Sequence, residues 1–556
     1  MRTVKIKEYL KDFNYLENFR MLATNIRGDV VGGITTGIIA LPLLLAFGVS
    51  SGMGAKAGLI GAVALGFFAA VFGGTPAQIS GPTAPMTVIV AAIAVQYSDQ
   101  PFLIFQIIAL GGIFQIVLGL TKVGRYIQYM PYPVVSGFMN GIGVIIFLTQ
   151  INAFFGLEAI GNPGAAFMAI PHSVMSLNPA ATAIGCFTLI LVYALPRINR
   201  HFPGTIVAIV AMTLAAQILH LDIARIGDIP VGLPSFQKLH LNWPIFSVMV
   251  GPAIVLAVMG LLDSLLTSLI ADRLTATRHN SNRELIGQGL GNCLTGLLGG
   301  IPGAGATIRT EINIRNGGKT PLAGVVYAAL TLASMLFLGQ WLKFIPLTCL
   351  AAVLFKAAVD IMDFKILKQI HKIPFFDIAV LVVVLLLTVA INIMVAVGVG
   401  LLLACILFVK RMGDLLAIDA VTLNDVEKSW VADESWHEKL THDEKNRVLV
   451  FQLNGPLFFG ASSNFLKSAE KHKDFAGLIL RMHRVPEVDT TGAYALEELA
   501  ELFKKSKKFL FVSGLAEEPK TFLRKLRILD VIGEDNIFRR FDDAACRALE
   551  LLRAKH

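Results

Sequence analysis

Two stretches rich in glycine, proline and threonine interrupt an otherwise apolar sequence and carry residues suited to binding an ion. The first runs from Ser80 to Thr87 (SGPTAPMT). Proline in the first turn of a helix costs no hydrogen bond, so Pro85 predicts a helix start close to Thr83 and Ala84. A helix start has unpaired backbone N–H groups and roughly half a positive charge, which favours an anion. The alternative is a helix that is merely kinked by proline.

The second stretch runs from Pro302 to Arg309 (PGAGATIR) and leads into a short helix that ends near Asn316. About ten residues span only ~15 Å as a helix, half of a bilayer. Backbone groups that lack helical hydrogen bonds are tolerated at membrane depth only where they contact protein or a water-filled cavity. Two such helix interruptions, one in each half of a membrane domain, are typical of a transporter's substrate site. We therefore expect two half-helix starts that share one anion pocket. The alternative is that these glycines serve only close helix packing.

Asp263 lies midway along an apolar run, where an aspartate costs about 2.5–3.5 kcal/mol on insertion scales. Such a residue is functional by default. Thr267 follows four residues later on the same helix face, and a carboxylate with a hydroxyl and free carbonyls suits a hard monovalent cation or a proton. Arg309 offers an alternative, because it could either neutralise Asp263 or add positive charge to the anion pocket.

The elements that must position these residues are membrane helices. The chain has 556 residues, of which 55% are hydrophobic and 16% charged. We expect fourteen spans in two sets of seven, and the odd number inverts the second set relative to the first. The spans lie near residues 29–49, 55–72, 83–97, 102–121, 131–153, 178–196 and 203–219, and near 248–270, 285–300, 305–314, 320–341, 345–358, 374–391 and 393–410.

Lysine and arginine gather in alternate loops, which predicts that both termini are cytoplasmic in a bacterial inner membrane. The net charge of +9 is thus explained by topology, and nucleic acid is not an expected partner. The charged segment from Arg273 to Glu284 is interpreted as a solvated loop. No nucleophile–base pair or metal cluster occurs in the spans, so no enzyme is predicted.

The sequence divides into four parts. Residues 1–28 form a cytoplasmic segment, 29–411 the membrane domain, 412–446 a polar linker and 447–556 a small α/β domain in which strands alternate with helices. In this last domain Asp489 and Thr491 lie at a predicted helix start. An ordinary N-cap turn is the simpler interpretation there, and a phosphorylation switch the alternative.

These motifs identify a resemblance to the sulfate permease (SulP) family of anion transporters, which carry a C-terminal STAS domain. The resemblance rests on ISGPTAPM from Ile79, on NGGKTPLAG from Asn316, and on the blocks that begin at Leu262, Thr277 and Ile301. Within the family the chain is most similar to the cyanobacterial sodium-dependent bicarbonate transporters. The resemblance implies fourteen helices in a seven-plus-seven inverted repeat with core and gate subdomains, an elevator-like movement and a homodimer.

The resemblance also implies binding residues. It assigns the anion to Thr83, Ala84, Ala306 and Thr307, and sodium to Asp263, Thr267, Gly305, Ala306 and Thr307. Arg309 departs from the bicarbonate branch and resembles sulfate and dicarboxylate carriers, so it is included as an anion-site candidate. Thr491 matches a residue that is phosphorylated in related anti-sigma-factor antagonists, which suggests a regulatory partner.

Sodium-coupled uptake of bicarbonate is the leading functional hypothesis. Proton-coupled transport of sulfate or a C4-dicarboxylate is the first alternative, and a passive anion channel or a STAS-based sensor is an alternative of another class. No organic cofactor is expected.

Overall fold

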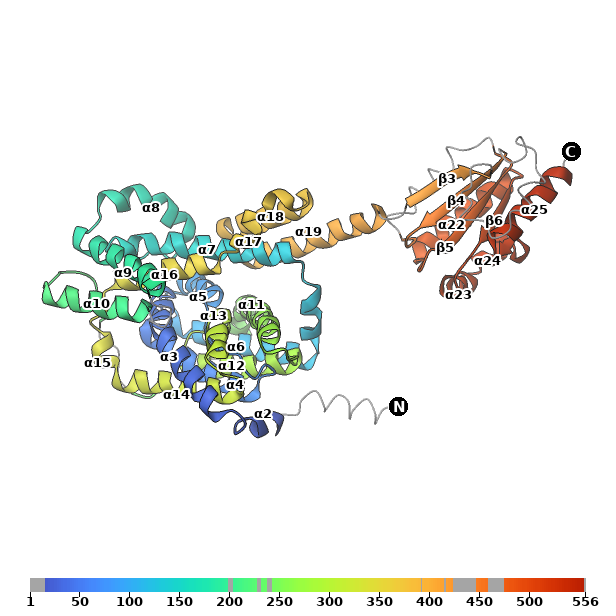
Figure 1. The fold of residues 1–556 in the computed structure, drawn as a ribbon. Coiled ribbons are helices and arrows are strands. Elements are labelled where there is room, and N and C mark those ends of the chain that lie inside the picture. Colours follow the sequence, from blue (N-terminus) through green and yellow to red (C-terminus); the bar gives the residue numbers. More distant parts are fainter. Residues whose placement is uncertain are drawn as a thin grey trace. The chain divides into compact units, whose positions relative to one another are not determined.

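The computed structural model describes residues 16–198, 204–227, 232–237, 243–391, 393–414, 417–423, 447–458 and 475–554. It divides into two compact units, Met1–Leu401 and Leu402–His556 (Figure 1). The first is a helical membrane domain and the second an α/β domain, as the sequence predicts. Six helices in the described ranges are long and apolar enough to cross a bilayer, by length and composition.

Each of the fourteen expected spans contains a helix. The first set contains α3 (Ile26–Ser50), α4 (Ala55–Phe72), α5 (Ala84–Gln96), α6 (Pro101–Leu120), α7 (Tyr132–Phe154), α9 (Pro179–Ile198) and α10 (Gly204–Ile218). The second contains α11 (Trp243–Thr275), α12 (Ser281–Leu297), α13 (Thr307–Arg315), α14 (Pro321–Phe337), α16 (Leu347–Ile361), α18 (Phe375–Ala390) and α19 (Ile393–Asp414). A further helix, α8 (Pro163–Met175), lies where none was predicted.

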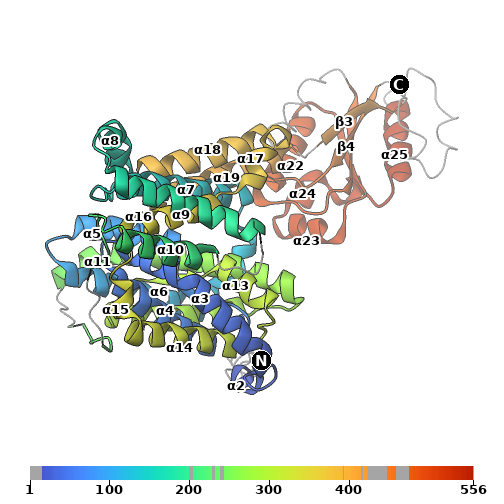
Figure 2. The same ribbon diagram turned by 60° about the vertical axis from the view of Figure 1, so that its left-hand side comes forward.

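Corresponding helices of the two sets make corresponding contacts. The first helix of one set, α3, packs on α14, while the first helix of the other, α11, packs on α6. Likewise α4 packs on α14 and α12 packs on α6. Helices of each set thus pack on a helix of the other set in the same way, as expected for two repeats related by a two-fold axis. Figure 2 shows a second group, α7, α9, α16 and α18, gathered beside these helices.

Two very short strands join the halves of the membrane domain. β1 (Ser80–Pro82) pairs antiparallel with β2 (Gly303–Gly305), with Gly81 opposite Ala304. A Cβ atom on Gly303 would lie 2.0 Å from the carbonyl oxygen of Gly81, so only glycine allows the strands to approach this closely. Gly303 in the second stretch therefore does serve close packing, but the packing of backbone on backbone rather than helix on helix.

The second unit is a five-stranded sheet in the order β3-β4-β5-β6-β7, with helices on both faces. Its strands are β3 (Ala417–Thr422), β4 (Val448–Asn454), β5 (Gly477–Arg484), β6 (Phe509–Ser513) and β7 (Ile537–Phe538). One core forms beneath α22 (Thr490–Lys505) and α24 (Ile528–Ile532), and another beneath α25 (Phe541–Ala554). The helix α23 (Glu517–Lys525) precedes α24.

The expected linker, 412–446, needs a correction. Helix α19 continues to Asp414, and β3 pairs antiparallel with β4 as an edge strand of the sheet. A six-residue strand that contains Asp419 lacks the long apolar run that marks β4 and β5, so its sequence predicts a linker rather than a strand. Residues 415–416 and 424–446 lie outside the described residues.

Candidate functional site

The β1–β2 pair brings two helix starts to one place in the membrane domain. β1 leads through Thr83 into α5, and β2 leads through Ala306 into α13. Both breaks confirm the helix starts predicted from glycine and proline. Thr83 makes no side-chain hydrogen bond to its helix, and Ala306 has no polar side chain to offer one. The first-turn N–H groups of both helices therefore keep their partial positive charge.

Helix α11 contacts this crossing through hydroxyl side chains. Thr267 Oγ1 donates to the carbonyl oxygen of Gly305 at 2.9 Å and lies 2.8 Å from Thr307 Oγ1. The backbone N–H of Gly305 donates to Ser264 Oγ at 3.1 Å. The structure thus brings together Thr267, Gly305 and Thr307, three of the residues singled out for a cation, and adds Ser264, which the sequence analysis missed.

Asp263 lies one helical turn before Thr267. Its Oδ2 atom and Thr83 Oγ1 are both buried, and neither makes a hydrogen bond of normal geometry with the described residues. The Thr83 hydroxyl and the Arg309 guanidinium are nevertheless close enough to stabilise the charged carboxylate. A buried carboxylate oxygen without a hydrogen-bond partner is unusual in a folded protein, so Asp263 is the residue of this site that could hold a cation or a proton.

Arg309 points towards β1. Its side chain is 4% exposed, and Nη1 donates to the Tyr327 hydroxyl at 2.8 Å while Nη2 donates to the carbonyl oxygen of Pro82. Arg309 is not among the residues that line the large cavity of this domain. Glu311 lies at the surface in an ion pair with Arg315. Arg309 therefore contributes positive charge and holds β1 in place, without facing the cavity.

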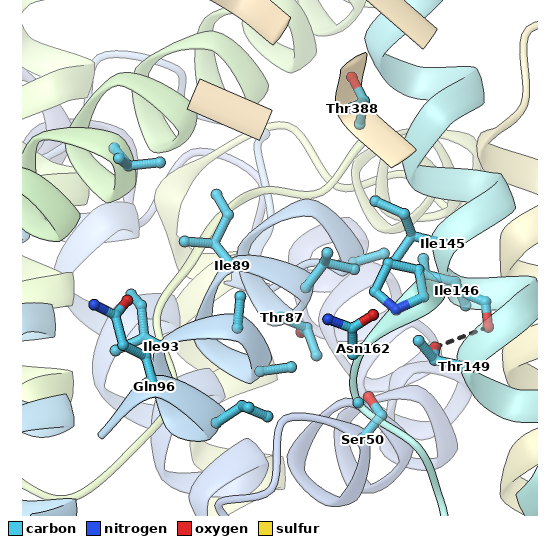
Figure 3. A pocket seen from close by; sticks show the side chains of 18 of the residues that line it. Ser50, Thr87, Ile89, Ile93, Gln96, Ile145, Ile146, Thr149, Asn162 and Thr388 are labelled. Atoms are coloured by element: carbon cyan, nitrogen blue, oxygen red, sulfur yellow. Dashed lines mark hydrogen bonds between the residues drawn. The ribbon is translucent and has the colours of Figure 1, made fainter. Parts of the chain in front are cut away.

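The large cavity has a volume of about 570 Å³ and opens among α5, α7, α11 and α18 (Figure 3). It reaches the start of α5 at Ala84 and Thr87, and its walls are mostly apolar, as at Ile89 and Ile145. Thr87 cannot offer its proton freely to a ligand, because its hydroxyl donates to the carbonyl oxygen of Thr83 at 2.8 Å. The cavity thus gives access to one of the two half-helix starts.

A buried polar network behind the crossing was missed by the sequence analysis. Arg283 and Glu284 are 5% and 1% exposed, which corrects the interpretation of Arg273 to Glu284 as a solvated loop for these two residues. A signal was present in the sequence. Glu284, Gln288 and Asn292 recur every four residues, which places them on one face of α12 towards the crossing.

The loop singled out in the α/β domain is a helix N-cap. Asp489 Oδ1 accepts a hydrogen bond from the N–H of Gly492 at 2.6 Å, at the start of α22. The side chains of Thr490 and Thr491 are exposed. This geometry fits the simpler interpretation of the loop and leaves the Thr491 hydroxyl accessible.

Comparison with known proteins identifies both units. Residues 26–384 match the model of the sulfate permease family, and residues 439–544 match the STAS domain. The chain is similar to the bicarbonate transporters BicA of Picosynechococcus sp. (37% identity over 94% of this chain and 95% of the relative) and Synechocystis sp. (39% over 92% and 93%). It is also 31% identical to the putative sulfate transporter YvdB of Bacillus subtilis, over 93% of this chain and 96% of that protein.

Solved structures give the same result. The transmembrane domain of a cyanobacterial bicarbonate transporter BicA matches with a TM-score of 0.62 and 41% identity, covering 67% of this chain and 97% of that one. The structure of SLC26A9 shares the fold, with a TM-score of 0.83 at 18% identity over 100% of this chain and 95% of that one. The chain therefore belongs to the sulfate permease family of anion transporters and carries a C-terminal STAS domain.

Proposed function

We propose that this chain takes up bicarbonate by secondary active transport coupled to sodium. The observation that carries the proposal is the β1–β2 crossing, which holds two half-helix starts beside a buried carboxylate oxygen that has no hydrogen-bond partner among the described residues. The relatives named as bicarbonate transporters, similar along nearly their whole length, support the choice of anion.

The charges near the crossing favour a small anion. The two helix starts supply roughly one positive charge together. Arg309 adds one, and Asp263 removes one. A bound sodium ion would leave the site more positive still, and thus suited to an anion. Because Arg309 donates to Tyr327 and Pro82, it acts at a distance, and the anion would lie against Thr83, Ala84, Ala306 and Thr307.

The donor set fits a sodium ion. Asp263 would supply a carboxylate, Thr267 and Thr307 hydroxyl oxygens, and Gly305 and Ala306 backbone atoms, which are the hard oxygen ligands that such a cation prefers. When bound, sodium would neutralise the Asp263 carboxylate. The chain's own contribution is to hold these oxygens together through the Thr267 contacts to Gly305 and Thr307.

Sulfate or a C4-dicarboxylate remains the alternative substrate, with a proton on Asp263 in place of sodium. The specific observation in its favour is Arg309, whose fully buried guanidinium adds charge that a dianion would use. A passive anion channel or a STAS-based sensor is the alternative of another class. Accumulation against a gradient separates the two classes, because a channel cannot concentrate its substrate.

The experiment is uptake of labelled bicarbonate into proteoliposomes that contain the full chain, with and without an inward sodium gradient. We expect sodium-stimulated accumulation that excess sulfate, fumarate or chloride suppresses weakly. The alternative substrate would be favoured if uptake is independent of sodium, is driven by a proton gradient, and is abolished by sulfate or fumarate. Equilibration without accumulation would indicate a channel.

The arrangement in the cell is also a proposal. We infer a homodimer in the bacterial inner membrane with both termini in the cytoplasm, working by an elevator-like movement of the helices that carry the crossing. Labelling of single cysteines at Lys122 and Lys319, from outside intact cells and after lysis, tests the orientation. Reaction only after lysis is the expected result.

We further propose that Thr491 is phosphorylated and that a cytoplasmic protein distinguishes the phosphorylated from the unphosphorylated STAS domain. Its support is the exposure of the side chain at the first turn of α22, where a phosphate is favoured by the helix dipole. Phosphopeptide mapping of the protein from its native cells tests it, with Thr490 as the neighbouring control site. Consistent absence of phosphate on Thr491 would reject the proposal.

A further inference from the structure

Glu284 is a buried carboxylate whose hydrogen-bonding capacity is filled by N–H donors. Its Oε2 atom accepts from the backbone N–H groups of Gly74 at 2.8 Å and Thr75 at 2.9 Å. Its Oε1 atom accepts from Gln78 Nε2 at 2.8 Å and from Gln288 Nε2 at 2.7 Å. Four donors occupy both oxygens, so Glu284 has no free acceptor site for a cation, whereas Asp263 Oδ2 makes no hydrogen bond with the described residues.

The carboxylate of Glu284 fixes which way the Gln78 amide points. A carboxylate only accepts hydrogen bonds, so the NH₂ group of Gln78 must face it. The carbonyl end of the amide then faces α11, where Gln78 Oε1 accepts from Ser268 Oγ at 3.0 Å. Ser268 also lies 2.8 Å from Thr75 Oγ1. Gln78 is thereby held at both ends, between α12 and the residue that follows Thr267.

The Gln78 amide lies directly against Gly305. A Cβ atom on Gly305 would come within 2.2 Å of Gln78 Nε2 and 2.6 Å of Gln78 Cδ, and its three nearest atoms all belong to Gln78. The backbone of Gly305 does not have a positive φ, so another residue type would be allowed there on conformational grounds. It is the contact with Gln78 that excludes a side chain.

Besides its strand pairing and its N–H bond to Ser264, Gly305 has two further contacts. Gln78 packs against its Cα atom, and the Thr267 hydroxyl donates to its carbonyl oxygen at 2.9 Å. Groups that orient metal ligands without touching the metal typically change affinity 10- to 100-fold when they are altered. The Gln78 amide is therefore one of the contacts that fix the Gly305 peptide, which in turn binds Thr267 beside Thr307.

We infer that Gln78, oriented by Glu284, is a positioning residue that sets the affinity of the Gly305 cation site without contacting the ion. This inference rests on the cation site of the proposed function, but not on the identity of the anion. It gives the two buried carboxylates different roles: Asp263 would contact the ion, and Glu284 would orient the Gln78 amide.

The test measures sodium binding to the purified full chain in detergent. The melting temperature is recorded against sodium concentration, with choline keeping the ionic strength constant. Gln78→Ala should weaken the apparent sodium affinity about 10-fold. The matched control is Gln217→Ala on α10, which removes the same amide outside the network and should leave the sodium titration unchanged. In proteoliposomes Gln78→Ala should raise the sodium KM and leave kcat at saturating sodium within about twofold.

A double-mutant cycle tests the contact itself. Gly305→Ala collides with the Gln78 amide and should abolish stabilisation by sodium. Gln78→Ala makes room for the new methyl group, so Gly305→Ala combined with Gln78→Ala should bind sodium more tightly than Gly305→Ala alone. Additive effects of the two substitutions would show that the residues do not act through this contact.

The outcomes separate this inference from the proposed function. A lower melting temperature for Gln78→Ala with unchanged sodium affinity would mean a purely structural role and overturn the inference. Failure of sodium to stabilise the unaltered protein would overturn it as well. Stabilisation by sodium with the predicted loss in Gln78→Ala, but without bicarbonate uptake, would uphold the inference and reject bicarbonate as the substrate.

Discussion

Asp263 is the residue on which the proposed coupling to a cation depends. Its Oδ2 atom is buried and lacks a hydrogen-bond partner among the described residues, so a cation or a proton at this oxygen would stabilise the side chain. Asp263→Asn keeps the shape of the side chain and removes the charge. We expect it to reduce sodium-stimulated uptake by at least about 10-fold, measured in proteoliposomes. Glu311→Gln, at an exposed ion pair, is the control and should retain uptake. Normal sodium dependence in Asp263→Asn would remove Asp263 from the cation site.

Some of these residues could be predicted from sequence and others could not. Thr267, Gly305 and Thr307 could be, because a four-residue spacing and a glycine-rich break are local signals. The direction of Arg309 could not, because it is decided by Tyr327 and by the carbonyl of Pro82 from the other half of the domain. The burial of Glu284 could not be predicted for a similar reason. It follows a run of charged residues, and its burial depends on Gly74 and Thr75, more than two hundred residues earlier.

The β1–β2 pair is the element on which the site depends. Gly303→Ala would place a methyl group 2.0 Å from the Gly81 carbonyl oxygen, a collision with backbone that no rotamer relieves. We expect this variant to lose uptake and to melt at a lower temperature than the unaltered protein. Gly398→Ala on α19 is the matched control, because its added Cβ meets no atom within 4 Å. Equal behaviour of the two variants in a melting assay would contradict the role given to the crossing.

Long helices with a clear apolar pattern could be predicted from the sequence, whereas very short elements could not. Long apolar runs predicted the helices, and both half-helix starts were found within a residue or two. The strands β1 and β2 have three residues each, too few for any periodicity to show. Helix α8 was missed because Pro171 interrupts a segment of only 13 residues. In the α/β domain the amphipathic segment near 463–472 also predicts a helix, and it lies outside the described residues.

At the scale of the whole molecule, the edge strand β3 decides where the transport domain can be separated from the STAS domain. A chain that ends at residue 446 would keep β3 but lose its partner β4, and would expose an unpaired strand edge. A chain that ends at Asp414 removes β3 as well. We expect the shorter chain to be the more monodisperse in detergent, as measured by size-exclusion chromatography. Equal aggregation of both would show that β3 has no such effect.

The STAS domain should also respond to acid. Burial, together with the charges of Arg481 and Arg484, holds the pKa of His483 below its ordinary value of 6.5. The unfolded chain therefore binds this proton more readily than the folded one, so stability is complete above about pH 6.5 and falls as the pH drops below it. The protection of the β5 amides, taken as the intrinsic exchange rate at each pH divided by the observed rate, should fall between pH 7 and 5.5. His483→Gln should flatten this dependence, and an unchanged fall in protection would contradict the assignment.

The backbone pairing of Ser80, Gly81 and Pro82 with Gly305, Ala304 and Gly303 has a kinetic consequence. A strand from each half lies in the same ribbon, so neither half of the binding site can shift without carrying the other. Under the proposed mechanism, an anion and a cation bound beside this ribbon would therefore reach either face of the membrane together.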